Sequence, residues 1–189
     1  MNIQNITYGK LTAENFDVNS LDDFIRHQQV KKCWRKINNV FMLVKNEYVE
    51  DWSLDRHREV ACEILNGIKE GGVGFGAFCD GRVVGYTYLS KQLFGSKLQY
   101  MELKLFHVSE PFRGNGIGKE LFKRTCTEAK QSGAKKLYIS AHSSEESQAV
   151  YRSLGCMDAV EVNKDIAENE PYDVQMEYQL DLHPKGVGI

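Results

Sequence analysis

Residues 113–118 read Arg-Gly-Asn-Gly-Ile-Gly and stand between a predicted strand, residues 99–108, and an amphipathic stretch, residues 116–132. Glycines at such a turn let backbone N–H groups converge without obstruction from Cβ atoms, and the start of a helix adds a partial positive charge. This arrangement is typical of a cradle for a pyrophosphate group. A glycine-rich surface turn is the alternative interpretation of the six residues taken alone.

Two familiar phosphate-binding patterns do not fit this segment. A P-loop needs GxxxxGK[ST], but Lys119 follows Gly118 without the first glycine or the Ser/Thr. The Rossmann fingerprint needs GxGxxG in an early βαβ unit and an acidic residue on the next strand. Here the spacing is GxGxG, the unit lies late in the chain, and residues 136–141 carry no acid. Both interpretations therefore fail.

The hydrophobic pattern places this segment within a regular order of elements. Helices are expected from near Ser20 towards Trp34, from Ser53 to Gly71, over residues 116–132, and from a capping box at Ser143 and Glu146 to Gly155. Strands are expected over residues 3–11, 73–79, 82–90, 99–108, 136–141, 157–163 and 174–180. This order predicts an α/β protein of the α+β type, with a mixed, mostly antiparallel central sheet flanked by helices.

Length and composition favour one ordinary domain that is not a general nucleic-acid binder. The chain has 189 residues, of which 42% are hydrophobic and 26% charged, and a net charge of −2, so it lacks the basic excess of a nucleic-acid binder. Its longest apolar run, residues 40–44, is too short to cross a membrane. Five scattered cysteines without a CxxC pair indicate reduced thiols and no metal site. With no signal-peptide pattern at residues 1–10, we expect a cytoplasmic protein.

Residues 113–118 resemble the acetyl-coenzyme A loop, [RQ]xxGx[GA], of the GNAT superfamily of N-acetyltransferases, in the RGxGIG form common in bacterial members. The preceding residues 107–112, HVSEPF, match the strand end that comes before this loop in the family. A second family block, Nxx[AS]xx[FLV]YxxxG, is matched by Ser147, Val150, Tyr151 and Gly155, with Ser144 in place of the asparagine. Two blocks in the right order are far more specific than either alone.

The resemblance covers about residues 73–180, and it implies a fold, a reaction and a division of the chain. It implies a single GNAT domain over residues 1–189, with coenzyme-binding blocks at 99–155, an acceptor side at 1–72 and a tail at 182–189. It also implies acetyl transfer from acetyl-coenzyme A to a primary amine of a small molecule or peptide, by direct attack in a ternary complex. A non-catalytic module that binds or senses acyl-coenzyme A is the alternative, and a homodimer stays open.

The resemblance further implies which residues contact the coenzyme. These are Phe106, His107, Val108, Arg113, Gly114, Asn115, Gly116, Ile117, Gly118, Lys119, Ser144 and Ser147. Because the family separates two strands at this point, the backbone N–H of Val108 is the expected donor to the oxyanion.

Tyr151 is the candidate general acid. The resemblance implies that its hydroxyl faces the thioester sulfur, and a phenol is a suitable proton donor for a departing thiolate. The alternative is an aromatic side chain that only packs beside Val150 and Leu154.

Glu102 is the candidate base, since some family members carry a glutamate at this position. Strand alternation puts the even-numbered residues 102–108 on one face and the odd-numbered ones on the other. An ion pair between Glu102 and Lys104 is the alternative interpretation. His107, which could titrate near neutrality, is a second candidate base, and His142 follows the strand at residues 136–141.

Residues 34–60 combine aromatic and acidic side chains, and the resemblance places them on the acceptor side. The relevant side chains are Trp34, Glu47, Tyr48, Glu50, Asp51 and Trp52. Such a mixture suits a cationic amine through cation–π contacts and charge pairing. A solvated loop over the hydrophobic core is the alternative.

Overall fold

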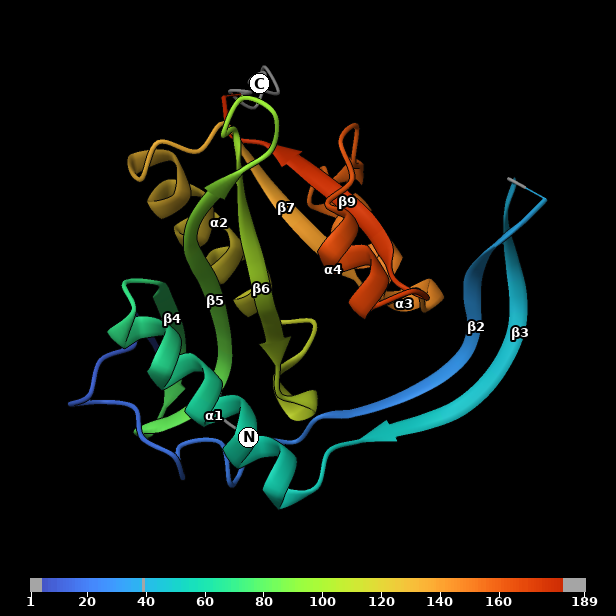
Figure 1. Cartoon of the computed structure of the whole chain (residues 1–189). Coiled ribbons are helices and arrows are strands. Elements are labelled where there is room, and N and C mark those ends of the chain that lie inside the picture. Colours follow the sequence, from blue (N-terminus) through green and yellow to red (C-terminus); the bar gives the residue numbers. More distant parts are fainter. Residues whose placement is uncertain (1–4, 39, 182–189) are drawn as a thin grey trace, which may run out of the picture.

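The computed structural model describes residues 5–38 and 40–181, and a seven-stranded sheet forms its centre (Figure 1). The strands lie in the order β1 (Ile6–Lys10), β4 (Val73–Cys79), β5 (Arg82–Phe94), β6 (Tyr100–Val108), β7 (Lys136–Ala141), β9 (Val174–Gln179) and β8 (Met157–Asp158). Every neighbouring pair is antiparallel except β6 and β7, which run parallel. The predicted fold class is therefore confirmed. The predicted tail, residues 182–189, lies outside the described residues.

Helices cover both faces of this sheet. Helix α1 (Leu54–Lys69) buries Val60 and Ile64 against β5 on one face, and α2 (Ile117–Gln131) buries Phe122 against β6 on the other (Figure 1). As predicted, α1 starts at Ser53, whose hydroxyl accepts a hydrogen bond from the backbone N–H of Arg56. Two shorter helices, α3 (Glu145–Ser153) and α4 (Lys164–Asn169), flank the second half of the sheet. No helix within the described residues is long and apolar enough to span a bilayer.

A long two-stranded arm replaces the predicted helix that begins near Ser20. Strands β2 (His27–Ile37) and β3 (Val40–Asp51) pair with each other and curve away from the central sheet (Figure 1). Val30 and Cys33 of β2 are both buried although they lie three residues apart, and a register shift between Val30 and Lys32, whose extra residue lies in β3, interrupts the regular pairing between them. This spacing imitates a helical period, which explains why the helix prediction was wrong.

Two predicted details near the C-terminus also need correction. Helix α3 is capped by Ser144 and not by Ser143, because Ser144 has the extended backbone of an N-cap and its hydroxyl accepts from the N–H of Ser147, whereas the hydroxyl of Ser143 accepts from Arg35 Nη1. The predicted strand over residues 157–163 is only β8, two residues long. Beyond β8 the chain leaves the sheet, and Asn163 caps α4 by accepting from the N–H of Ile166.

Candidate active site

Strands β6 and β7 form a fork. They pair only where residues 100–102 face residues 136–138, whereas β6 continues to pair with β5 as far as Val108. Ser109 donates its N–H to Val84 on β5, so the preceding Val108 directs its own N–H and C=O to the opposite edge, into the fork. The carbonyl of Val108 accepts a bond from Arg113 Nε there at 3.0 Å. The strand separation that the resemblance implies is thus present.

A cavity of about 1680 Å³ runs through this fork. Pockets for one drug-sized ligand measure roughly 300–1,000 Å³. The fork therefore has room for a large co-substrate and a second molecule beside it.

The glycine segment forms one wall of the cavity. Gly114 and Gly116 have φ angles of +78° and +77°, and a Cβ atom at either would meet nothing within 4 Å. Gly116 is the N-cap of α2, whose first N–H groups have no acceptor inside the helix. Arg113 fastens the loop through Val108 O and through His27 O, at 2.7 Å. Open glycines, unpaired N–H groups and a helix start fit the pyrophosphate of a coenzyme.

Most of the predicted coenzyme contacts line the cavity. Those that line the cavity are Phe106, His107, Val108, Arg113, Gly114, Gly116, Ile117, Gly118, Lys119 and Ser147. Asn115 and Ser144 do not. The amide of Asn115 donates to the carbonyls of Phe112 and Arg113 and so shapes the loop from outside. Ser144 is fully buried, where it caps α3 and accepts from Gln28 Nε2 at 2.9 Å.

Tyr151 also lines the cavity, from α3. Its ring packs against Phe106 with the ring centroids 5.9 Å apart, and its hydroxyl has no hydrogen-bond partner among the described residues. Burial raises the pKa of Tyr151 above that of an ordinary phenol. The hydroxyl therefore stays protonated at neutral pH and can donate into the cavity.

The predicted alternation along β6 is wrong, because a bulge interrupts it. Tyr88 of β5 faces Leu105 but Leu89 faces Leu103, so Lys104 has no partner of its own. Lys104 pairs with Glu63 of α1 at 2.9 Å, not with Glu102 as the alternative interpretation held. One inserted residue reverses the faces that follow it.

Because of the bulge, the two candidate bases, Glu102 and His107, lie on one face of β6. Phe106 lies on the other face, where it packs against Phe122 of α2. Glu102 lies near Lys104 and Glu63, outside the cavity wall, and burial raises the pKa of its carboxyl. His107 lines the cavity under Trp52, at 4.9 Å between ring centroids. Burial, followed by the charge of Arg26, lowers the pKa of His107 well below its ordinary value, so the imidazole is neutral.

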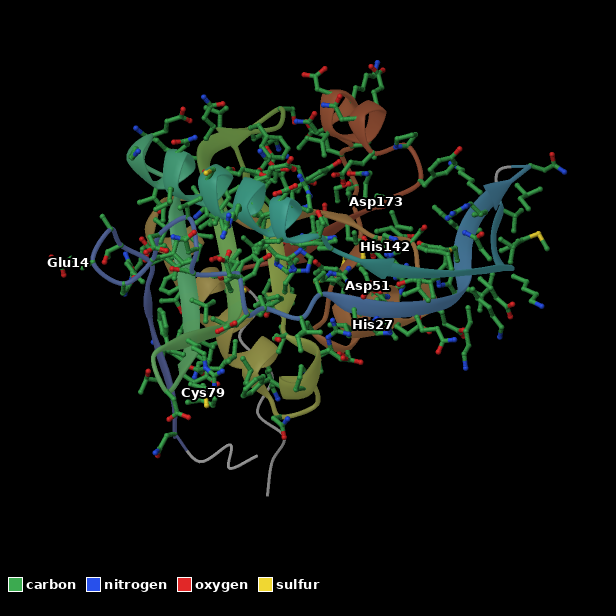
Figure 2. The ribbon with its side chains drawn as sticks, turned by 90° about the horizontal axis from the view of Figure 1, so that it is seen from below. Glu14, His27, Asp51, Cys79, His142 and Asp173 are labelled. Carbon is green, nitrogen blue, oxygen red and sulfur yellow. The ribbon has the colours of Figure 1, made fainter. Side chains whose placement is uncertain are left out.

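The root of the arm forms the other wall. Of the predicted acceptor-side residues, Glu50 and Trp52 line the cavity. Tyr48 bonds His142, another lining residue, at 2.8 Å between Oη and Nε2. The remaining three lie elsewhere: Trp34 packs against the core, Glu47 pairs with Lys45, and Asp51 pairs with His27 beside the root of the arm (Figure 2).

The lining residues that sequence reasoning missed include three charged or acidic side chains on the acceptor side, Arg26, Glu170 and Asp173. Burial, with the neighbouring Glu170, raises the pKa of Asp173 to about 8 (Figure 2). The only sequence signal for the two acids is the short acidic stretch at residues 168–173. Within the described residues, no group of three or more His, Cys, Asp and Glu could hold a metal ion.

Comparison with known proteins agrees with this architecture. The sequence model of the acetyltransferase (GNAT) family matches residues 37–156, so the chain belongs to the GNAT acetyltransferase family. No curated protein matches the sequence.

Solved structures of acetyltransferases share the fold. Nourseothricin acetyltransferase superposes with a TM-score of 0.69 at 13% identity, over 93% of this chain and 98% of that chain. PaiA N-acetyltransferase from Thermoplasma acidophilum, in complex with coenzyme A, gives 0.59 at 16% identity, over 93% and 99%. A GNAT family acetyltransferase from Elizabethkingia anophelis, with acetyl-coenzyme A bound, gives 0.55 at 17%, also over 93% and 99%. At such identities the likeness concerns the fold alone.

Proposed function

We propose that this protein transfers the acetyl group of acetyl-coenzyme A to a primary amine of a small molecule or peptide, directly in a ternary complex. The observation that carries the proposal is one cavity that joins the glycine cradle, the free N–H of Val108 and the hydroxyl of Tyr151. The cradle holds the pyrophosphate, with Lys119 and Lys123 on the same wall to meet negative charge.

The residues at the fork would serve each stage of the transfer. Val108 N–H donates to the carbonyl oxygen as the amine nitrogen bonds to the carbonyl carbon and negative charge collects on that oxygen. Tyr151 gives its proton to sulfur as the carbon–sulfur bond breaks, which leaves coenzyme A as a thiol and the amine as an amide. The proton of Tyr151 is replaced by the one that the attacking nitrogen loses. An acceptor that arrives as an ammonium ion loses one further proton to a base.

Glu102 is the proposed base, and it would act through water because it lies behind the cavity wall. Its raised pKa supports this role, since a base whose pKa is closer to neutrality accepts a proton more readily. Asp173 is a second candidate, because it lines the cavity itself. The lowered pKa of His107 makes that imidazole a weaker proton acceptor than an ordinary histidine. The five free cysteines support a reducing compartment, the cytoplasm.

The test combines binding with turnover. Calorimetry with coenzyme A, followed by an amine panel with acetyl-coenzyme A and thiol release as the signal, should give both binding and transfer. Absence of coenzyme binding would contradict the proposal outright. Tight binding of acetyl-coenzyme A with no thiol release from any amine would instead favour the non-catalytic sensing module.

A further inference from the structure

Arg26 is a buried arginine whose hydrogen-bonding capacity is mostly unused. Only 8% of the residue is exposed, yet it lines the cavity. A guanidinium has five N–H donors. One nitrogen, Nη2, donates to Glu50 Oε2 at 3.0 Å, while Nε is buried without a partner. This guanidinium forms no other hydrogen bond within residues 5–38 and 40–181.

The backbone around Arg26 is fixed to the end of the fork. Ile25 donates its N–H to Ser109 Oγ at 3.0 Å and accepts from the N–H of Glu110 at 2.9 Å. His27 accepts from Arg113 Nη1 at 2.7 Å. The backbone on both sides of Arg26 is therefore tied to the segment after β6, which keeps this residue beside the fork.

The guanidinium lies among the residues that would surround the acceptor. It packs over the ring of Trp52, 5.5 Å from Cζ to the ring centroid. Burial lowers the pKa values of His107 and His142, and the positive charge of Arg26 adds to this lowering. Across the acceptor side, the cavity wall also carries the carboxyl groups of Glu170 and Asp173. This half of the cavity thus offers both a cationic donor and acidic groups.

A buried arginine with unpaired N–H donors destabilises the fold unless a ligand accepts hydrogen bonds from them. Buried donors without partners destabilise a fold, and more so when they belong to a charged group. Arg58, by comparison, binds both carboxylate oxygens of Asp22, at 3.1 and 2.8 Å. The unused donors of Arg26 therefore indicate a place for an oxygen acceptor supplied from the cavity.

We propose that Arg26 binds a carbonyl or carboxylate oxygen of the acceptor and so selects amines that carry such an oxygen close to the nitrogen. The substrate class is then an amino acid, an amino-acid amide or a peptide, not a simple alkylamine. Its oxygen lies on Arg26 and its ammonium faces Glu170 and Asp173. This inference rests on the proposed acetyl transfer.

The test uses three compounds that differ only in the oxygen-bearing group: lysine, lysinamide and 1,5-diaminopentane. The first carries a carboxylate, the second a neutral carbonyl and the third neither. Calorimetric titration into the protein–coenzyme A complex measures binding, and thiol release with acetyl-coenzyme A measures kcat and KM. In the wild type, we expect at least one oxygen-bearing compound to surpass the diamine about 10- to 100-fold in affinity and in kcat/KM, the range of one hydrogen bond to a charged group.

Arg26→Gln should bring this ratio close to one, mainly through a higher KM for the acceptor, and should leave coenzyme A affinity unchanged. Arg26→Lys should keep part of the preference, since it retains charge but not the planar fork. If Arg26→Gln destabilises the fold because Glu50 loses its partner, the double variant Arg26→Gln/Glu50→Gln removes both members of the pair. Arg124→Gln is the matched control, because Arg124 also pairs with a glutamate, Glu120, and packs on a ring, Tyr8, but does not line the cavity.

Three outcomes would overturn the inference. The first is that no compound of the set binds the wild-type complex, and the second is that the diamine binds as well as the others. The third is that Arg26→Gln lowers kcat equally for all three compounds, which would place the guanidinium on the thioester. Failure of the proposed function looks different: selective binding that depends on Arg26, with no acetyl transfer.

Discussion

Glu102 of β6 and Tyr138 of β7 form the last pair that joins these two strands. The pairing of β6 with β7 begins only two residues earlier, at Tyr100 and Lys136. Beyond Glu102 the facing edge of β6 has no strand partner in the described part of the chain, which leaves the N–H of Val108 free for a ligand. A longer parallel joint would close the fork and occupy the same N–H groups with a carbonyl of β7.

Gly116→Asp should abolish coenzyme binding. The substitution puts a side chain and a negative charge at the mouth of the cradle, where the pyrophosphate would lie. Isothermal calorimetry should show loss of coenzyme A binding, and coenzyme A should no longer raise the melting temperature. Gly81→Asp is the control, because Gly81 has the same φ of +77° and the same open surroundings but lies in the β4–β5 turn. Equal affinity in the two variants would contradict the assignment of the loop.

Tyr151→Phe tests the general acid. It keeps the ring against Phe106 and removes only the hydroxyl, so stability and coenzyme affinity should stay nearly constant. With a working acceptor, kcat should fall ~10²–10⁴-fold, the usual contribution of a general acid. Tyr8→Phe, on β1 and outside the cavity, should retain full turnover. Unchanged kcat in Tyr151→Phe would leave this side chain as a packing residue.

Asp173→Asn should change how stability depends on pH. Burial and Glu170 raise the pKa of Asp173 from its ordinary 3.8 to about 8. Between these values the folded protein holds a proton that the unfolded chain releases, so wild-type stability falls as pH rises. The asparagine variant lacks this decline and should melt higher than wild type above about pH 8. Thermal melts across this range measure the effect.

The control for that series is Asp158→Asn, which removes an exposed carboxylate paired with Arg152. The melting temperature of this variant should depend on pH in the same way as that of the wild type. A curve for Asp173→Asn that also parallels the wild type would mean that Asp173 is ionised like an ordinary surface acid.

The elements that the sequence predicts correctly are those specified by local signals. Ser53 starts α1, the Asp80-Gly81 dipeptide joins β4 to β5, and Gly133 follows α2 with φ of +92°. The two errors of pattern have different causes. Val30 and Cys33 of β2 are buried three residues apart, like neighbours on a helix, whereas the inserted Lys104 reverses the faces of β6. One inserted residue resets a period of two, and nothing in the periodicity marks where it occurs.

The two halves of the cavity also differ in how well the sequence predicts them. The glycine cradle is contiguous in sequence, so its pattern could be found without a structure. The acceptor wall is assembled from Arg26, Trp52 and Asp173, which belong to three segments far apart in the chain. Arg26 lies within a stretch whose spacing indicates a helix, and Asp173 depends on the turn after α4. Only long-range packing brings these side chains together.

The last prediction concerns Glu177, whose buried carboxylate holds the closed end of the fork. It accepts hydrogen bonds from Lys136 Nζ at 2.7 Å, from the hydroxyl of Tyr100 at 2.5 Å and from the N–H of Val160 at 3.0 Å. Tyr100 and Lys136 are also the first pair of the joint between β6 and β7. Glu177→Gln should therefore weaken both the fold and the geometry of the fork.

We expect Glu177→Gln to lower the free energy of unfolding by about 3–5 kcal/mol, because it leaves Lys136 without its anion in a mostly buried site. Urea unfolding measures this, and coenzyme affinity should fall in parallel. Burial alone would raise the pKa of Glu177, but the bonds from Lys136 and Tyr100 outweigh it and lower that pKa. The unfolded chain therefore binds this proton first as pH falls, so the contribution of Glu177 is present at neutral pH and is lost in acid.

Two further variants separate the ion pair from general damage. Lys136→Met combined with Glu177→Gln removes both charges and should recover part of the lost stability, since replacing a buried pair costs less than breaking it. Glu59→Gln breaks the exposed pair with Arg56 and should cost less than about 1 kcal/mol. If Glu177→Gln is no more destabilising than Glu59→Gln, then Glu177 does not hold the fork. Stability would then have to come from the apolar packing of Leu137 and Met176 in the same strands.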